Sequence, residues 1–154
     1  RRGDGTVPAR VYEPSKSAAA KDAIVLEARR CIKAQGWQCF DGEPLALLLV
    51  ARFPIPASAS KARRALLLNQ PHAQKPDVDN VVKLALDALT MAGAWIDDKQ
   101  VTTVVARALW DEAPSLELQV HLDADFGIAL GRGGSSRLLS LHERLTMQAG
   151  RAAS

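Results

Sequence analysis

The stretch KPDVDNVVKLALDALTMAG, residues 75–93, contains the clearest helix signal in the sequence. Its apolar residues recur with helical spacing and form one face, which consists of Val82, Ala85, Leu86 and Leu89. Pro76 favours a change from extended to helical backbone, so the helix should begin at or just after Asp77. Gly93 is a natural C-cap. We therefore predict an amphipathic helix over residues 77–93, with one face in a core.

The segments on either side of this helix predict a small α+β domain. The run PLALLLVARF is apolar almost throughout, which is typical of a strand buried on both faces. Two later segments are rich in alternating apolar residues, and the polar residues between them favour an antiparallel hairpin with a longer loop. The predicted elements are a helix that starts at Ser15 or Ser17 and ends at Gly36, a buried strand over Pro44–Phe53, a basic helix over Ser58–Leu68, an exposed loop over Asn69–Pro76, and strands over Val101–Trp110 and Leu116–Leu122. We expect a small mixed sheet of three or slightly more strands, with flanking helices.

The composition changes after Asp123. A glycine-rich segment over residues 127–134 leads into an amphipathic pattern over Ser136–Gln148. We predict a flexible turn followed by a helix there. The chain is accordingly divided into a main domain over residues 1–123 and a C-terminal appendage over residues 124–154.

The composition also limits the class of protein. Hydrophobic residues make up 47% and charged residues 24% of the 154 positions, which is typical of one globular domain. The longest stretch without Asp, Glu, Lys or Arg is Ala65–Gln74, which is too short to span a membrane. The two cysteines, Cys31 and Cys39, are too few for a disulfide framework, so a reducing, cytoplasmic setting is expected. The net charge of +3 permits a polyanionic partner without requiring one.

A basic segment that ends in two carboxylates marks the candidate site. Its basic residues are Lys61, Arg63, Arg64, Lys75 and Lys83, and its only acidic residues are Asp77 and Asp79. This uneven distribution of charge requires an explanation, which the net charge alone does not give.

Carboxylates beside a lysine favour metal-assisted chemistry on a phosphodiester. Asp79 and Lys83 are four residues apart, so both lie on the helix face that points away from the core. If Asp77 and Asp79 converge with Asp98, their oxygens suit Mg²⁺, or Mn²⁺ in its place. The helix over residues 79–93 is about 21 Å long, so Asp98 must return toward the helix start for this to happen. The sequence leaves that proximity open.

Each of these residues also has a simpler interpretation. Asp77 alone is typical of a helix N-cap, and Asp79 is a favourable charge in a first helical turn. Asp79 and Lys83 form a surface ion pair in this interpretation. Residues 97–98 are then a polar turn, and residues 61–64 are a solvated helix face.

Taken together, the motifs resemble the RusA family of Holliday-junction resolvases. The resemblance rests on the run Lys75–Asn80, on Lys83, on Asp87-Ala88-Leu89, and on Gly93 followed by Trp95-Ile96-Asp97-Asp98 and Gln100-Val101. It covers roughly residues 10–122. It implies a small α/β homodimer, cytoplasmic and associated with the nucleoid, that binds four-way DNA junctions and nicks two opposing strands with Mg²⁺. Family members usually have an N-terminal strand ahead of the position that is residue 1 here.

The resemblance also assigns roles to single residues. Asp77, Asp79 and Asp98 match the catalytic, metal-binding aspartates of the family, and Lys83 matches its catalytic lysine. Asp97 matches an accessory acid. Two alternatives remain. One is an enzyme that acts on branched DNA of another kind, and the other is a non-catalytic junction-binding module in which the carboxylates are only caps.

The DNA path is expected to follow the basic segment. We predict that it is lined by Lys61, Arg63, Arg64 and Lys75, because these are the densest basic residues ahead of the carboxylates. His72 is expected in a loop close enough to Asp77 to touch a substrate phosphate.

Overall fold

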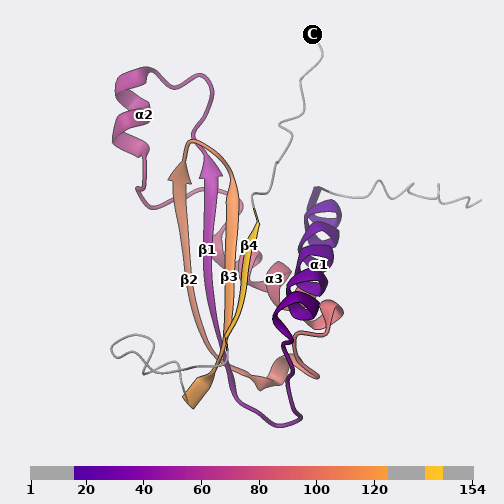
Figure 1. The fold of residues 1–154 in the computed structure, drawn as a ribbon. Helices are drawn as coiled ribbons and strands as arrows, with labels where there is room; N and C mark the ends of the chain where they lie inside the picture. The colour runs from indigo at the N-terminus through magenta and orange to yellow at the C-terminus, as the bar shows by residue number, and fades with distance from the viewer. Residues whose placement is uncertain (1–15, 125–137, 144–154) are drawn as a thin grey trace, which may run out of the picture.

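The structure is a computed structural model that describes residues 16–124 and 138–143. In chain order, these residues form α1 (Lys16–Gln35), β1 (Leu45–Pro54), α2 (Lys61–Leu67), α3 (Val78–Ala92), the 3-10 turn η1 (Asp98–Gln100), β2 (Val101–Asp111), β3 (Ser115–Leu122) and β4 (Leu138–Glu143). The predicted α+β class with a small mixed sheet is confirmed (Figure 1). The predicted Ser15 cap lies outside the described residues.

The sheet is built around β1. Its strand order is β2-β1-β3-β4, with β1 parallel to β2 and antiparallel to β3. The predicted hairpin of β2 and β3 is wrong, because β1 lies between them and residues 112–114 carry the chain across its end. The apolar composition of β1 explains this order, since a strand with few polar side chains is most stable at the centre of a sheet.

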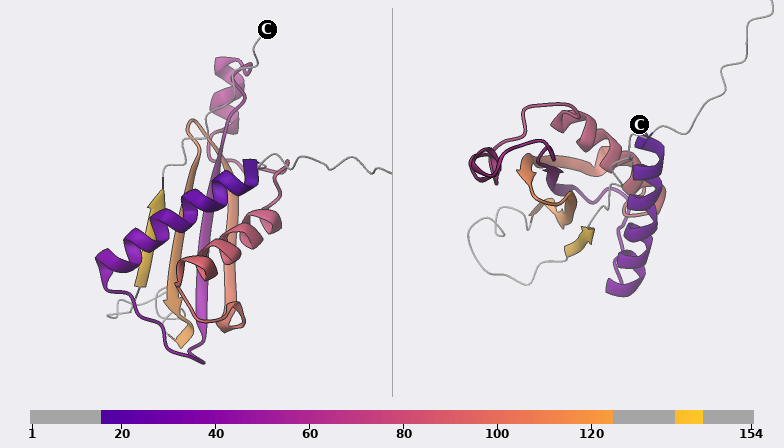
Figure 2. Two further views of the ribbon diagram at one scale, coloured as in Figure 1. Left: turned by 90° about the vertical axis from the view of Figure 1, so that its right-hand side faces the viewer. Right: turned by 90° about the horizontal axis from the view of Figure 1, so that it is seen from above.

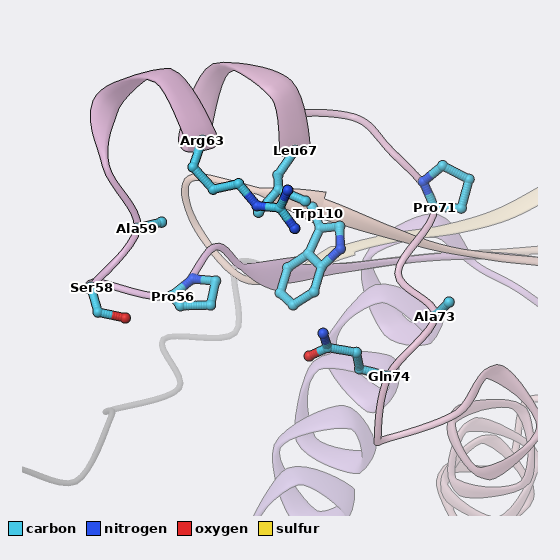
Figure 3. A pocket seen from close by; sticks show the side chains of 9 residues that line it. All are labelled: Pro56, Ser58, Ala59, Arg63, Leu67, Pro71, Ala73, Gln74 and Trp110. Carbon is cyan, nitrogen blue, oxygen red and sulfur yellow. The ribbon is translucent and has the colours of Figure 1, made fainter.

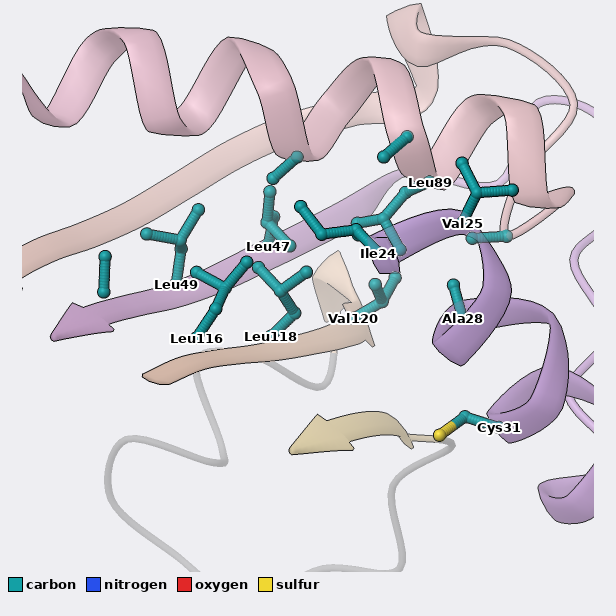
Figure 4. Close-up of a cluster of buried hydrophobic side chains, with 14 of the residues drawn as sticks. Ile24, Val25, Ala28, Cys31, Leu47, Leu49, Leu89, Leu116, Leu118 and Val120 are labelled. Carbon is teal, nitrogen blue, oxygen red and sulfur yellow. The ribbon is translucent and has the colours of Figure 1, made fainter. Parts of the chain in front are cut away.

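Helices α1 and α3 lie on the same face of the sheet and pack against each other (Figure 2). The core fills the space between them and the strands (Figure 4). Its most buried members, at most 2% exposed, are Ile24, Ala28, Leu45, Leu47, Leu49, Ala85, Ala88, Leu89, Ala94, Leu118 and Val120. Full burial of one Leu, Ile or Val side chain contributes about 1.5–3 kcal/mol, so this layer fixes α3 against the sheet. In the described residues, no helix combines the length and the apolar composition needed to cross a membrane.

The C-terminal helix prediction is wrong for residues 138–143, which form β4 instead. This strand pairs antiparallel with β3, in the register Leu118 with Leu141. Without β4, the backbone N–H and C=O groups along one side of β3 would form an open edge. The hydrogen bonds of the sheet therefore override a local pattern that fits a short helix as well as a strand. The rest of the predicted helix, residues 136–137 and 144–148, lies outside the described residues.

The segment between α2 and α3 is tied to the outer edge of β2. The backbone N–H of Asn69 donates to the Trp110 carbonyl, the N–H of Trp110 donates to the Gln70 carbonyl, and the N–H of His72 donates to the Ala108 carbonyl, each at 2.9 Å. The predicted exposed loop is thus partly an extension of the sheet. Helix α2 has no buried residue and stands beyond the end of the sheet (Figure 1). These bonds fix the direction in which the chain enters α3.

Candidate functional site

Asp77 occupies the N-cap position of α3, but its side chain does not cap the helix. Its backbone is extended, with φ −72° and ψ 156°, and its carboxylate accepts no bond from the backbone N–H groups of the first turn. The carboxylate Oδ1 instead accepts a 3.2 Å hydrogen bond from Nδ2 of Asn80. An ordinary N-cap carboxylate binds those N–H groups. The carboxylate is therefore available to a ligand, which the N-cap interpretation does not account for.

Asp77 lines a cleft of about 770 Å³ between the start of α1, the start of α3 and the ends of β1 and β3. Lys75 and Lys83 line the same cleft. Neither lysine makes an ion pair within 4 Å to a residue in the described ranges, whereas the guanidinium of Arg52 on the cleft wall is bound by Asp111 and Glu117. Among the described side chains that line this cleft, the positive charge free to meet a phosphate comes from the two lysines.

Asp79 is exposed in the first turn of α3. The surface ion pair with Lys83 that its spacing permits is not formed between these two residues in the described structure. Asp77, Asp79 and Lys83 are thus held at one end of α3, as their spacing predicts. Gly93, in the left-handed conformation with φ 83°, ends the helix at the far end, where its N–H donates to the carbonyls of Leu89 and Thr90.

Asp98 lies at that far end. It begins η1, just before β2, whose first residue Val101 pairs with the first residue of β1, Leu45. The cleft that contains Asp77 is bordered by the other end of β1, at residues 51–53. Seven residues of strand separate these ends by about 23 Å, and the 15 residues of α3 span about 22 Å. One chain therefore does not bring Asp98 to Asp77, and no group of three His, Cys, Asp or Glu suited to a metal occurs in the part of the chain that the structure describes.

Asp97, the expected accessory acid, has a structural role. Its carboxylate accepts a 3.0 Å hydrogen bond from the Lys99 N–H and lies 3.1 Å from the Lys99 ammonium. These bonds, the backbone N–H first, hold the pKa of Asp97 below its ordinary value. Asp97 thereby caps the turn that presents its neighbour, Asp98, to solvent.

Gln100 is a residue of this loop to which the sequence reasoning gave no role. Its amide is buried, with the residue 4% exposed, and makes four backbone hydrogen bonds. Oε1 accepts from the N–H groups of Ile96 and Asp97 at 3.0 and 3.1 Å, and Nε2 donates to the carbonyls of Phe40 and Glu43 at 2.9 and 3.1 Å. The capping-box spacing of Asp97 and Gln100 is a signal by which the sequence reasoning could have found it.

The basic residues of α2 differ in what they contact. The guanidinium of Arg64 binds the carboxylate of Glu112 and contacts the Pro56 carbonyl at 3.4 Å. The bond to Glu112 raises the pKa of Arg64. Lys61 and Arg63 are exposed and make no ion pair with another described residue. Arg64 is therefore engaged in holding α2 to the β2–β3 connection, while the charges of the other two are not paired with an acid in the described residues.

His72 is not a surface residue. Its ring lies between Phe53, at 4.2 Å between ring centroids, and Trp110, at 4.3 Å, and the residue is 9% exposed. Burial lowers the pKa of His72 below its ordinary value. The expectation that it touches a substrate phosphate is corrected, because pairing of this segment with β2 turns the ring inward.

A cleft in which lysines lie next to a carboxylate suits a ligand that carries phosphates, such as a nucleic acid. The family described as endodeoxyribonuclease RusA matches residues 1–121, which is most of the chain. The protein is therefore of the class of endodeoxyribonucleases, enzymes that cut DNA internally. Within this class, the chain belongs to the RusA family. No curated protein matches the chain.

Proposed function

We propose that this protein is a Mg²⁺-dependent endonuclease that resolves four-way DNA junctions by paired, symmetric nicks. The observation that carries the proposal is the Asp77 carboxylate, which sits at a helix start without capping it and faces a cleft shared with Lys75 and Lys83. Family membership supports cleavage of DNA, and the sequence resemblance supports the junction as the substrate.

The two carboxylates at the start of α3 could supply part of the ligand set of a magnesium ion. Mg²⁺ is commonly held by one or two carboxylates, with waters and substrate phosphate oxygens in its other positions, and Mn²⁺ accepts the same oxygens. Asp77 and Asp79 are the residues that would hold it. When bound, the metal supplies activation of water and stabilisation of charge on the phosphate. Lys83 and Lys75 orient the phosphate in the cleft through their ammonium groups.

We propose further that the protein acts as a homodimer in which Asp98 of the partner subunit completes each site. Support comes from the distance that separates Asp98 from Asp77 within one chain. Exposed apolar side chains lie in this loop and in the α1–β1 connection bonded to it, since Ile96 is 60% and Phe40 58% exposed, as expected of a contact surface. A two-fold dimer matches the approximate two-fold symmetry of a four-way junction.

Mixing two inactive variants tests this arrangement. Asp77→Asn and Asp98→Asn should each fail to nick a labelled junction in Mg²⁺, yet bind it in EDTA. Co-refolded together, they should form heterodimers in which one site has both changes and the other has none. These heterodimers should nick one strand of the junction. A mixture as inactive as its components would contradict the shared site, as would a 16.6 kDa monomer in analytical ultracentrifugation that cuts fully.

A second candidate function is that of a junction-binding module without catalysis. It is favoured by the lack of a three-carboxylate group in the described residues, since a binder needs none. The unaltered protein distinguishes the two functions. An enzyme cuts the junction in Mg²⁺ and not in EDTA, whereas a module binds in both and leaves the DNA intact. Flapped and three-way DNA in the same assay would show a nuclease with another branched substrate.

A further inference from the structure

A second hollow, of about 340 Å³, lies under α2 (Figure 3). The Trp110 indole forms part of its wall, and Arg63, Gln74 and Ser58 stand around it, with Pro71 and Ala73 on the side of the loop. Its volume is at the small end of the range for ligand sites in proteins. It suits one flat ring system and is too small for a base pair.

The wall of this hollow is fixed before any ligand enters. Trp110 is 7% exposed, and both its backbone N–H and its carbonyl are bonded to residues 69–70. The edge contact with the ring of His72 supports the indole from behind. The indole presents only a small part of its ring to the hollow, but it is held rigidly, so little conformational freedom is lost when a second ring contacts it.

The polar side chains at its mouth are free to bind. Neither the guanidinium of Arg63 nor the amide of Gln74 makes a hydrogen bond to a side chain or backbone group in residues 16–124, in contrast to Arg64. A guanidinium donates only, whereas a carboxamide donates and accepts. This is the pattern that pairs with the edges of nucleobases, which present donors and acceptors side by side.

The hollow is close to the proposed site of the cut. Gln74 lines the hollow and Asp77 lines the cleft, and three residues of chain span at most about 11 Å. Because a stacked strand rises about 3.4 Å per nucleotide, a base in the hollow belongs to a nucleotide within about three positions of the phosphate beside Asp77.

We propose that the hollow receives one unstacked nucleobase of the DNA substrate, in contact with the exposed part of Trp110 and with its edge on Gln74 and Arg63. The proposal rests on the proposed function, and it names the feature of the substrate that the site reads. Bases at the crossover of a four-way junction are already partly freed from their neighbours, so unstacking one of them costs less than in a duplex. A phosphate is a poorer occupant, because most of the wall is apolar or neutral.

A double-mutant cycle between base and protein tests the proposal. Junctions with a single abasic nucleotide, placed in turn at each position within four nucleotides of the crossover, are titrated with metal-free protein in EDTA. One position should weaken binding of the unaltered protein about five- to tenfold, because the base that fills the hollow is missing. Ala73→Leu, which fills the hollow, should bind the intact junction more weakly by a similar factor and lose the abasic effect at that position.

Lys61→Ala is the matched control. It removes a positive charge from the same helix as Arg63, but Lys61 does not line the hollow. It should weaken binding to every junction alike and leave the abasic effect in place. An unchanged thermal midpoint of Ala73→Leu ensures that the variant is folded.

Two outcomes overturn the base pocket while leaving the proposed function intact. One is a uniform abasic profile for a protein that cuts the junction in Mg²⁺. The other is an abasic effect of equal size in Ala73→Leu and in the unaltered protein. Failure to bind any branched DNA would overturn the proposed function and the pocket together.

Discussion

Replacing Gln100 by alanine removes the one buried amide that holds the Asp98 loop to the rest of the domain. Four backbone groups lose a hydrogen bond, namely the N–H groups of Ile96 and Asp97 and the carbonyls of Phe40 and Glu43, although the Phe40 carbonyl keeps its bond from the N–H of Glu43. Each such bond contributes about 1 kcal/mol net to the free energy of unfolding. The variant should therefore unfold more readily than the unaltered protein.

The expected loss is about 2–3 kcal/mol. All four bonds together amount to about 4 kcal/mol, but water reaches part of the loop and replaces some of them. For a domain of this size, each kcal/mol lowers the thermal midpoint by about 2–4 °C, so the shift should be roughly 5–10 °C. Circular dichroism during heating and in urea measures both quantities. Gln70→Ala is the control, because Gln70 is exposed, and a surface change of this kind stays within about 0.5 kcal/mol.

The same variant separates binding from cutting. Junction binding in EDTA should be unchanged, because the basic residues of α2 are remote from the loop. Nicking in Mg²⁺ at a temperature where the protein is folded should fall, because Asp98 loses its fixed position. A thermal midpoint within 2 °C of the unaltered protein, or full nicking by the folded variant, would refute the reasoning.

Three other changes test the remaining parts of the site. Asp79→Asn should reduce nicking by orders of magnitude. In EDTA it should bind the junction at least as tightly as the unaltered protein, because a negative charge near the phosphate is gone. A destabilised variant that still cuts would show that Asp79 has a structural role. Lys61→Ala should weaken junction binding and reduce its salt dependence by about one charge, whereas Arg64→Ala should mainly lower the thermal midpoint, and equal salt slopes for the two would contradict this distinction. Burial lowers the pKa of His72 in the folded protein. As the pH falls below about 6.5, the unfolded chain therefore binds a proton at this residue more readily than the folded chain does, and the free energy of unfolding decreases. His72→Phe keeps the stacked ring and should lose less stability than the unaltered protein between pH 7.5 and 5.5, as thermal melts at the two pH values would show.

The parts of the site that the sequence predicted are those fixed by local geometry. Asp79 and Lys83 share a face because helical spacing requires it, and Pro76 and Gly93 bound the helix through their own backbone preferences. The buried strand β1 also follows from local composition. These features depend on residues within one or two turns of each other, so no knowledge of the sheet is needed.

The parts that the sequence did not predict depend on strand order. The position of Asp98 follows from the pairing of Val101 with the first residue of β1, which places the loop at the far end of α3. The burial of His72 follows from the pairing of its segment with β2, and the strand β4 exists because β3 needs an edge partner. Each of these features depends on which distant backbone segments pair with each other. A local pattern of apolar residues does not determine that pairing.

The central place of β1 determines when the domain can fold as the chain is made. Both neighbours of β1 lie later in the sequence, so the most apolar strand leaves the ribosome with neither edge covered. Its parallel partner β2 is complete only at Asp111 and its antiparallel partner β3 only at Leu122. Any fragment that stops before those residues presents an apolar strand with two open edges, which is a template for aggregation. The RusA-family domain must therefore reach almost the end of its matched region before it can protect its own core.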